Sequence, residues 1–386
     1  MRILIAEDDA ILRRMLETYV QRWGYTSRAT KDGAEAWAAY QTEDFDIVIT
    51  DWMMPDVDGV ELCRRIRSRP KARYTYIIIL TSLDSKDALA MGIQRGADDY
   101  IVKPLEPAEL RARLTAGERI LHLERSLSES NAIMKRELEN AARTLASLLP
   151  ARKDIAQGVS LDWHFRPSIY IGGDFFNVLK LDDEHLAFYM IDVTGHGVSS
   201  ALLAVMISNV LRTSAVHGGI LKYADLPGAE HIVPPGEVAS TLNARFPMDP
   251  ESGMHFTLFY AVLNIRTREL RYVKAGHPHP LRLSSEGLSF LDKGSPPIGI
   301  IDGYAYPTHA QTLRPRDLLL VYSDGLLDSL DRQGSAFGGE RLVRLAKCHR
   351  QAGPAALVSE ISADFEQFKD GEAPDDDITM LALQVD

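Results

Sequence analysis

Four short apolar runs in the first 118 residues each end next to a side chain that carries a charge or a hydroxyl group. They lie at residues 3–6, 47–50, 76–80 and 100–102. Continuous apolar runs of this length are typical of strands buried on both faces of a parallel sheet. Amphipathic stretches with helical spacing separate them. Strands that alternate with helices predict βαβ units and an α/β domain with a doubly wound sheet.

The polar residues at the ends of these runs predict a single site. The carboxyl ends of parallel strands converge on one crevice, so Glu7, Asp8, Asp51, Thr81 and Lys103 are expected to meet there. Carboxylates at close range repel each other unless a cation lies between them. Mg²⁺ prefers oxygen ligands, and a metal-bound carboxylate can accept a phosphoryl group.

Residues 1–118 resemble the response-regulator receiver family in four stretches: ILIAEDD, DIVITDWMMPDVDG, IIILTS and GADDYIVKP. The resemblance implies a five-stranded parallel sheet in which Asp51 is the phosphorylated aspartate. It also implies that Mg²⁺ is bound by Asp8, Asp51 and the backbone carbonyl of Met53, with Glu7 acting through water.

The same resemblance assigns the switch residues. Thr81 and Lys103 would contact the phosphoryl group, and Tyr100 would reorient together with Thr81. The phosphoryl donor implied by the family is a cognate sensor histidine kinase. Every position of this motif set is present, so a working receiver domain is predicted.

Residues 119–150 have a different pattern, with no Gly or Pro between Gly117 and Pro150. Apolar or small residues recur there three or four positions apart: Ile120, Leu123, Leu127, Ser130, Met134, Leu138, Ala141, Leu145 and Leu148. This spacing predicts a coiled-coil linker helix with a stutter, and hence a homodimer formed through the linker. The alternative is a single helix packed on one domain.

The third part, residues 151–386, is predicted to be rich in strands with some helices. Strands are expected at residues 186–193, 254–265, 270–275 and 318–323. Helices are expected at residues 198–212, 235–245, 341–347 and 354–368. Residues 214–235, rich in Gly, Pro and His, are expected to form a loop or flap.

Four aspartates in this part share a setting, a strand end or a glycine-rich turn. Asp174 lies in IGGDFF, Asp192 in MIDVTGHG, Asp324 in LLLVYSDGL and Asp376 in PDDDITM. A single aspartate beside glycine is usually a turn residue. Four of them in one domain predict a binuclear metal centre, in which two close ions clamp a phosphate and activate water.

Residues from about 145 to 386 resemble the SpoIIE/RsbU branch of the metal-dependent 2C-type serine/threonine phosphatases. Beyond the four aspartate motifs, the shared stretches include FTLFYAVL, AGHPHPLRL and FGGERL. The resemblance implies a two-sheet β-sandwich flanked by helices. It also implies two Mn²⁺ or Mg²⁺ ions, held by Asp174, Asp192, Asp324, Asp376 and the backbone carbonyl of Val193.

Three further residues of this part stand out. Asn177 occupies the place where the family motif often has a second aspartate. His196 is next to the predicted metal loop, where it is either a structural hydrogen-bonding residue or a proton shuttle. His277, in AGHPHP, is expected to shape the domain rather than to take part in chemistry.

Charge and composition exclude several other classes of protein. The formal net charge of −11 argues against a nucleic-acid partner, which needs a basic surface. Two cysteines, Cys63 and Cys348, are too few for a disulfide framework. No apolar run approaches the length of a membrane span, so a cytoplasmic protein without a membrane partner is expected.

Together these features predict a receiver domain (1–118), a linker helix (119–150) and a phosphatase domain (151–386). Phosphorylation of Asp51 would regulate hydrolysis of phosphoserine or phosphothreonine, and the family resemblance suggests a phosphorylated anti-sigma-factor antagonist as substrate. Two alternatives stay open. One is a catalytically weak adaptor that binds a sigma-factor regulator according to its phosphorylation state. The other is a constitutive phosphatase whose linker serves mainly to dimerise it.

Overall fold

The structure is a computed structural model. It describes residues 1–69, 73–82, 95–150, 155–168, 171–195, 197–213, 218–226 and 229–386. The chain divides into two compact units, residues 1–135 and 136–386. Each unit is described by itself.

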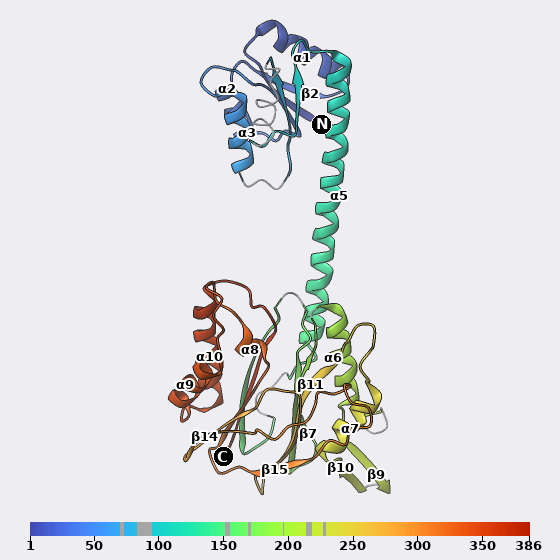
Figure 1. Cartoon of the computed structure of the whole chain (residues 1–386), viewed down its shortest axis with the longest axis vertical. Helices are drawn as coiled ribbons and strands as arrows, with labels where there is room; N and C mark the ends of the chain where they lie inside the picture. Colours follow the sequence, from blue (N-terminus) through green and yellow to red (C-terminus); the bar gives the residue numbers. More distant parts are fainter. Residues whose placement is uncertain are drawn as a thin grey trace. The chain divides into compact units, whose positions relative to one another are not determined.

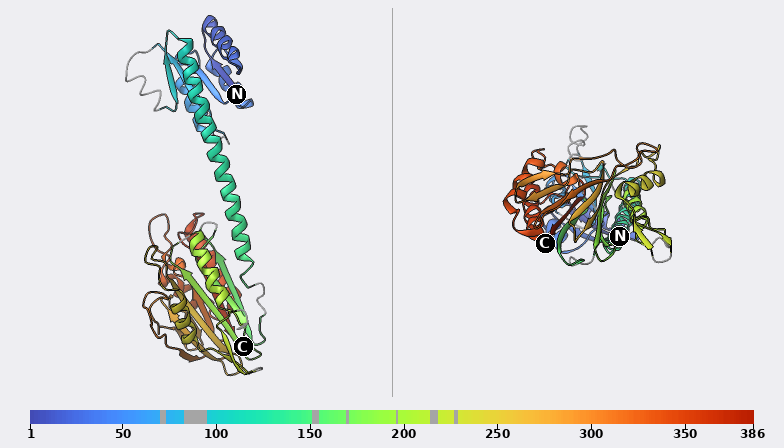
Figure 2. Two further views of the ribbon diagram at one scale, coloured as in Figure 1. Left: turned by 90° about the vertical axis from the view of Figure 1, so that its right-hand side faces the viewer. Right: turned by 90° about the horizontal axis from the view of Figure 1, so that it is seen from below.

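The first unit is a five-stranded parallel sheet with the strand order β2-β1-β3-β4-β5. Its strands are β1 (Arg2–Ala6), β2 (Thr26–Thr30), β3 (Ile47–Asp51), β4 (Tyr76–Thr81) and β5 (Asp99–Val102). The helices are α1 (Ala10–Arg22), α2 (Gly33–Thr42), α3 (Gly59–Ser68) and α5 (Pro107–Ala146). One face of the sheet packs against α1 and α5 and the other against α2 and α3 (Figures 1 and 2). The predicted doubly wound α/β fold is confirmed.

The core of this unit explains why the apolar runs predicted the sheet. β3 and β4 are buried along their whole length, as expected for central parallel strands covered on both faces. β2 has the sequence TSRAT and lies at the sheet edge, where most of its residues are at least partly exposed. An edge strand of this kind needs no apolar run, so no hydrophobic signal located it.

Helix α5 is a single helix of 40 residues. Leu110, Leu114 and Leu121 pack its first part against the receiver sheet. Further along, Leu123 and Leu127 expose more than half of their surface, at 67% and 57%. The helix therefore runs through most of the predicted linker and carries exposed leucines where the coiled-coil seam was predicted.

The second unit contains two five-stranded antiparallel sheets. The first has the order β15-β12-β11-β8-β7, with β7 (Phe175–Lys180), β8 (His185–Val193), β11 (Phe256–Asn264), β12 (Glu269–Ala275) and β15 (His309–Thr312). The second has the order β14-β13-β16-β17-β6, with β6 (Val159–Arg166), β13 (Leu281–Ser284), β14 (Gly287–Phe290), β16 (Leu318–Tyr322) and β17 (Ile378–Val385).

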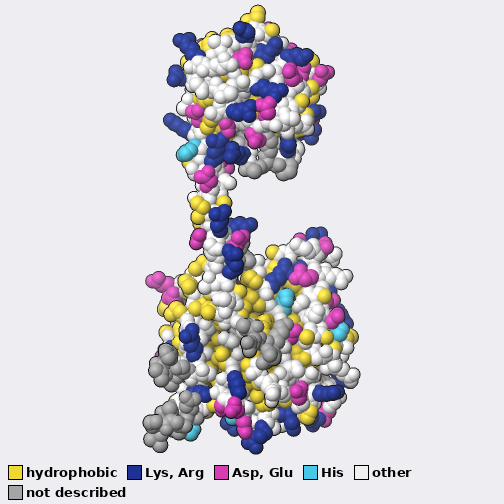
Figure 3. All heavy atoms as spheres, turned by 180° about the vertical axis from the view of Figure 1, so that it is seen from behind, with side chains coloured by type: hydrophobic (Ala, Val, Ile, Leu, Met, Phe, Trp, Pro, Cys, Tyr) yellow, Lys and Arg dark blue, Asp and Glu magenta, His cyan; other side chains and the backbone are white. Residues whose placement is uncertain are grey.

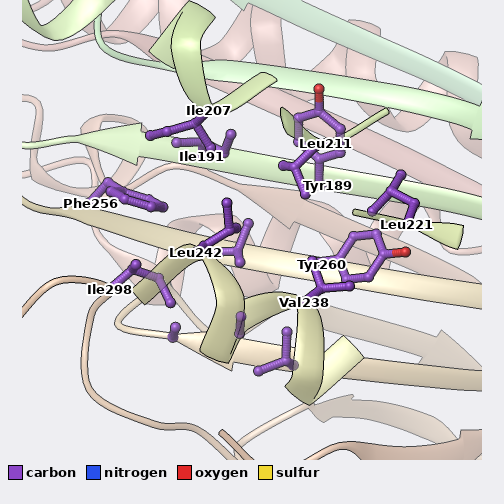
Figure 4. Packing of buried hydrophobic residues seen from close by; sticks show 14 of the residues in the cluster. Tyr189, Ile191, Ile207, Leu211, Leu221, Val238, Leu242, Phe256, Tyr260 and Ile298 are labelled. Carbon is purple, nitrogen blue, oxygen red and sulfur yellow. The ribbon is translucent and has the colours of Figure 1, made fainter. Parts of the chain in front are cut away.

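Three apolar clusters hold these layers together. One fills the space between the two sheets, with Phe188 and Phe259 among its members. Another packs the outer face of the first sheet against α6 (Val198–Val210) and α7 (Pro235–Arg245), as Figure 4 shows for Ile191, Ile207 and Leu242. The third covers the second sheet with α8 (Gly325–Asp328), α9 (Gly339–His349) and α10 (Gly353–Lys369). The predicted β-sandwich flanked by helices is confirmed.

The expectation of a loop at residues 214–235 is wrong for part of that range. β9 (Lys222–Leu226) and β10 (Ala229–Ile232) pair as an antiparallel hairpin. The hairpin begins beside Leu221, whose carbonyl oxygen accepts a hydrogen bond from the Val233 amide at 3.0 Å. Backbone pairing organises this segment, although its Gly, Pro and His content resembles that of a loop.

A search of the described helices finds none with the length and apolar character that crossing a membrane requires.

The inter-sheet cluster yields a prediction for stability. Phe188 is fully buried and its ring lies 6.1 Å from that of Phe259. We expect Phe188→Ala to lower the free energy of unfolding of the second unit by about 3–5 kcal/mol, because it leaves a cavity between the sheets. Urea unfolding of the full chain measures this. Phe290→Ala, at a side chain that is 43% exposed, is the matched control and should cost less than about 1 kcal/mol.

Candidate active sites

The receiver unit brings three carboxylates together at the ends of β1 and β3. Glu7, Asp8 and Asp51 each offer an oxygen atom, and these atoms lie within 4.8 Å of one another. Glu7 is fully buried and Asp51 is 8% exposed. The Lys103 ammonium, just after β5, lies 3.1 Å from Glu7 Oε2 and 3.0 Å from Asp51 Oδ2. The predicted convergence of four of these residues is therefore present.

The electrostatics of this cluster leave room for a cation. Burial, and then the charge of Asp51, raise the pKa of Glu7 to about 7, against the opposing effect of Lys103. Burial alone would lower the pKa of Lys103, but its hydrogen bonds to Asp51 and Glu7 raise it overall. One ammonium group faces three carboxylates, and oxygen ligands of this kind suit Mg²⁺. The donor set fits the expected ion.

The remaining receiver residues lie near this cluster. Thr81 ends β4, is fully buried and pairs with Val102 in the β4–β5 register. Tyr100 lies opposite Ile79, two residues from Thr81 along β4 and on the same face of the sheet. Met53, whose side chain is 67% exposed, follows directly in the loop after β3.

A glycine keeps that loop close to the carboxylates. A Cβ atom on Gly59 would lie 2.1 Å from the backbone oxygen of Asp51. The Gly59 amide also donates a hydrogen bond to the Trp52 carbonyl at 3.0 Å. Helix α3 therefore begins in direct contact with the backbone of the predicted phospho-acceptor, which only a residue without a side chain allows.

In the second unit, the four predicted aspartates come from both sheets. Asp174 directly precedes β7, and Asp192 is the penultimate residue of β8. Asp324 caps the start of α8 after β16, and Asp376 lies two residues before β17. Asp192 has the same strand parity as Phe188 and Met190, which face the second sheet, so its side chain points toward that sheet as well.

Burial, and then the neighbouring carboxylates, raise the pKa values of three of these aspartates. Burial, and then the charges of Asp324 and Asp376, raise the pKa of Asp192 to about 8. Burial and the charge of Asp192 raise the pKa of Asp174 well above its usual range. The pKa of Asp324 is also raised, by burial first and then by Asp328. Asp192 is thus the carboxylate that interacts with the other three.

The carboxylates of the second unit are more widely spaced than those of the receiver unit. Within the described ranges, the receiver trio is the one group of three acidic, His or Cys side chains whose ligand atoms all lie within 4.8 Å. The four aspartates of the second unit form a wider group, in which no three ligand atoms lie within 4.8 Å of one another among the described residues.

The sequence analysis did not single out Asp377, which contacts the backbone of this group through hydrogen bonds. Its buried carboxylate accepts hydrogen bonds from the Ser168 amide (2.8 Å) and the Asp174 amide (3.2 Å). Thr379 Oγ1 donates a hydrogen bond to Asp174 Oδ2. The run DDDIT was visible in the sequence, but only the fold shows that its third aspartate points inward.

The glycines of the motifs make this contact possible. A Cβ atom on Gly172 would lie 1.7 Å from Asp377 Oδ2, and one on Gly173 would lie 2.6 Å from the Val193 carbonyl oxygen. Similarly, a Cβ atom on Gly325 would lie 2.2 Å from the Asp377 carbonyl oxygen. Glycine therefore lets the Asp174 and Asp324 segments approach the same aspartate.

Asn177, His277 and His196 are the other residues of this part that the sequence analysis singled out. Asn177 pairs with Tyr189 and, by strand parity with Phe175, faces the helix side of its sheet, away from Asp192. His277 is buried, and its Nδ1 lies 3.0 Å from Oγ1 of Thr257, the residue that pairs with Asp192 across the strands. His196 lies outside the described residues.

The comparisons with known proteins agree with both halves of this description. Residues 182–386, more than half of the chain, match the family model "Stage II sporulation protein E (SpoIIE)". The chain belongs to the SpoIIE family. Residues 3–115 match the response regulator receiver domain. The family resemblance that the motifs indicated is therefore confirmed at both ends.

Curated relatives match this SpoIIE-family chain over part of its length. The transcriptional regulatory protein GltR of Pseudomonas aeruginosa is 41% identical over 114 residues, which is 30% of this chain and 47% of GltR. ResD of Bacillus subtilis is 38% identical over 115 residues, again 30% of this chain and 47% of the relative. The matched stretch thus spans about half the length of these relatives.

Among solved structures, the SiaA-PP2C domain of Pseudomonas aeruginosa is 19% identical and has a TM-score of 0.55. The match covers 67% of this chain and 99% of that domain. This likeness establishes the PP2C fold of the second unit.

The environment of His277 predicts a pH dependence. Burial, and then the charge of Lys274, lower the pKa of His277 to about 3. An unfolded histidine binds a proton near pH 6.5, so below that pH protons favour the unfolded chain until the folded pKa is reached. We expect the phosphatase unit to lose about 2 kcal/mol of stability from this residue between pH 7 and pH 5.

Urea unfolding at the two pH values measures this loss. In His277→Gln, the difference in unfolding free energy between the two pH values should be smaller by about 2 kcal/mol, because glutamine does not titrate. An equal pH dependence in the variant and the wild type would show that His277 is protonated in the folded protein.

Proposed function

We propose that the chain is a metal-dependent protein phosphatase for phosphoserine and phosphothreonine. The observation that carries the proposal is the position of Asp192, whose pKa is raised by burial and by Asp324 and Asp376. Buried carboxylates that repel each other are stabilised when cations bind between them. The PP2C fold and the SpoIIE family membership support the same activity.

The chain's own residues would hold two ions, Mn²⁺ or Mg²⁺. Asp174, Asp192, Asp324, Asp376 and the Val193 carbonyl would hold them. Bound ions of this kind supply an activated water and neutralise the charge of a phosphoryl group. Asp377 and Thr379 would orient Asp174 through the hydrogen bonds described above. The wide spacing of the four aspartates suits a pair of ions better than one.

The receiver unit would control this activity. Asp51, next to Lys103 and the acidic pair Glu7 and Asp8, has the surroundings expected of a phospho-acceptor with bound Mg²⁺. A cognate sensor histidine kinase would supply the phosphoryl group. Helix α5 joins the two units in the chain, and its exposed Leu123 and Leu127 are suited to pairing with a second copy in a homodimer.

The substrate we propose is a phosphorylated anti-sigma-factor antagonist in a cytoplasmic partner-switching pathway. The SpoIIE/RsbU resemblance of the motifs supports this choice. The acidic net charge of −11 supports a protein partner rather than a nucleic acid.

Asp192→Asn tests the catalytic proposal. We expect it to lower Mn²⁺-dependent hydrolysis of p-nitrophenyl phosphate at least 100-fold, because the carboxylate that interacts with the other three proposed ligands would lose its charge. Asp183→Asn, at a side chain that is 97% exposed, is the matched control and should keep full activity. If the wild type has no Mn²⁺-dependent activity and Asp192→Asn changes nothing, the adaptor alternative would replace this proposal.

Beryllofluoride, which mimics a phosphoryl group on aspartate, tests the proposed control. We expect it to change turnover several-fold or to shift the oligomeric state, measured by light scattering, in the wild type. Asp51→Asn should abolish the effect because the acceptor carboxylate is gone. A wild type in which neither quantity responds would support the constitutive alternative.

A further inference from the structure

Lys369, the last residue of α10, is a lysine buried inside the phosphatase unit, with 2% of its side chain exposed. Lysines are rarely buried, because removing an ammonium group from water is costly unless it is paired. Lys369 Nζ donates hydrogen bonds to the Leu330 carbonyl oxygen at 2.8 Å and to Asp375 Oδ2 at 3.1 Å. These two partners belong to different segments of the chain.

The three residues form a closed ring of hydrogen bonds. Asp375 Oδ2, which accepts from Lys369, also accepts from the Leu330 amide at 2.9 Å. The ammonium thus satisfies the carbonyl of Leu330 while the carboxylate satisfies its amide. A charged group in such a ring fixes the backbone of Leu330 against the side chain of Asp375.

Each of the two joined segments leads directly to one of the proposed metal ligands. Asp375 is adjacent in sequence to Asp376. Leu330 is six residues after Asp324, and the intervening turn is held by hydrogen bonds from the Leu327 amide to the Asp324 carbonyl (2.8 Å) and from the Ser329 amide to the Gly325 carbonyl (3.2 Å). A displacement of Leu330 would therefore be passed on to Asp324.

We propose that Lys369 is a positioning residue that keeps Asp324 and Asp376 at the separation required for metal binding, an inference that rests on the proposed function. Asp324 and Asp376 lie on separate segments of the chain, after β16 and before β17, so a fixed separation between them needs a contact that joins the two segments. The ring made by Lys369, Leu330 and Asp375 is that tether. Its loss would weaken metal binding more than it would slow the metal-saturated reaction.

A second set of ion pairs on the same segments provides a control. Arg332 pairs with Asp370 at 2.7 Å and with Glu372 at 3.1 Å, and all three side chains are at least 45% exposed. Exposed ion pairs contribute little, whereas the ring has one buried member, since Lys369 is 2% exposed although Asp375 is 57% exposed. If general tethering of the segments were sufficient, removing Arg332 would have the same effect as removing Lys369.

Lys369→Met keeps an unbranched side chain that is one atom shorter, and it removes the ammonium group. In the full chain, we expect the Mn²⁺ concentration for half-maximal hydrolysis of p-nitrophenyl phosphate to rise about tenfold, with turnover at saturating Mn²⁺ within about threefold of the wild type. Asp375→Asn should raise the same concentration by a smaller factor. Arg332→Gln should leave it unchanged.

Calorimetric Mn²⁺ titration in an Asp8→Asn background, which removes the receiver site, separates this inference from the proposed function. If the wild-type phosphatase unit binds Mn²⁺ without turning over substrate, the proposed function fails, and weaker binding in Lys369→Met still supports the tether. An unchanged Mn²⁺ requirement in Lys369→Met, with only a lower urea midpoint, would overturn the inference. If Lys369→Met does not fold, an unchanged requirement in Asp375→Asn would overturn it.

Discussion

Repulsion between carboxylates removed from water is the constraint on which both proposed sites of this chain depend. In each unit the fold brings acidic side chains together at or near the ends of buried strands. Glu7 in the receiver and Asp192 in the phosphatase unit both have raised pKa values as a result. Such sites favour cation binding, because a bound cation reduces the repulsion between the buried carboxylates.

The two units meet this constraint with different architectures. The parallel sheet of the receiver brings neighbouring strand ends to one edge, and Lys103 partly neutralises the cluster. The antiparallel sandwich has to collect its aspartates from two sheets. It does so through close backbone contacts at Gly172 and Gly325 and through the buried carboxylate of Asp377. The phosphatase site therefore depends on more supporting residues.

Most strands and most of the proposed site residues could be predicted from the sequence, and those that were not predicted have physical reasons in common. Apolar runs predicted the strands that end at Asp51 and near Asp192, and in the parallel receiver sheet the convergence of strand ends also predicted which residues would meet. The edge strand β2 and the β9–β10 hairpin carry little apolar patterning, so no apolar run located either of them, although the receiver resemblance implied a fifth strand. Family resemblance supplied the ligand sets, which spacing alone left open.

Asp377 and Lys369 were missed for a different reason. Each is a polar residue whose role depends on burial and on partners distant in sequence, Asp174 in one case and Leu330 in the other. A charged residue is most often on the surface, so nothing in the local sequence marked these two as interior.

The number of Mn²⁺ ions bound per chain tests the central claim most directly. Equilibrium dialysis followed by metal analysis of the full chain should give three ions, one in the receiver and two between the phosphatase aspartates. Asp192→Asn should reduce this number to one, because Asp192 is the carboxylate that interacts with the other three proposed ligands. An ion count that is unchanged in Asp192→Asn would contradict the account.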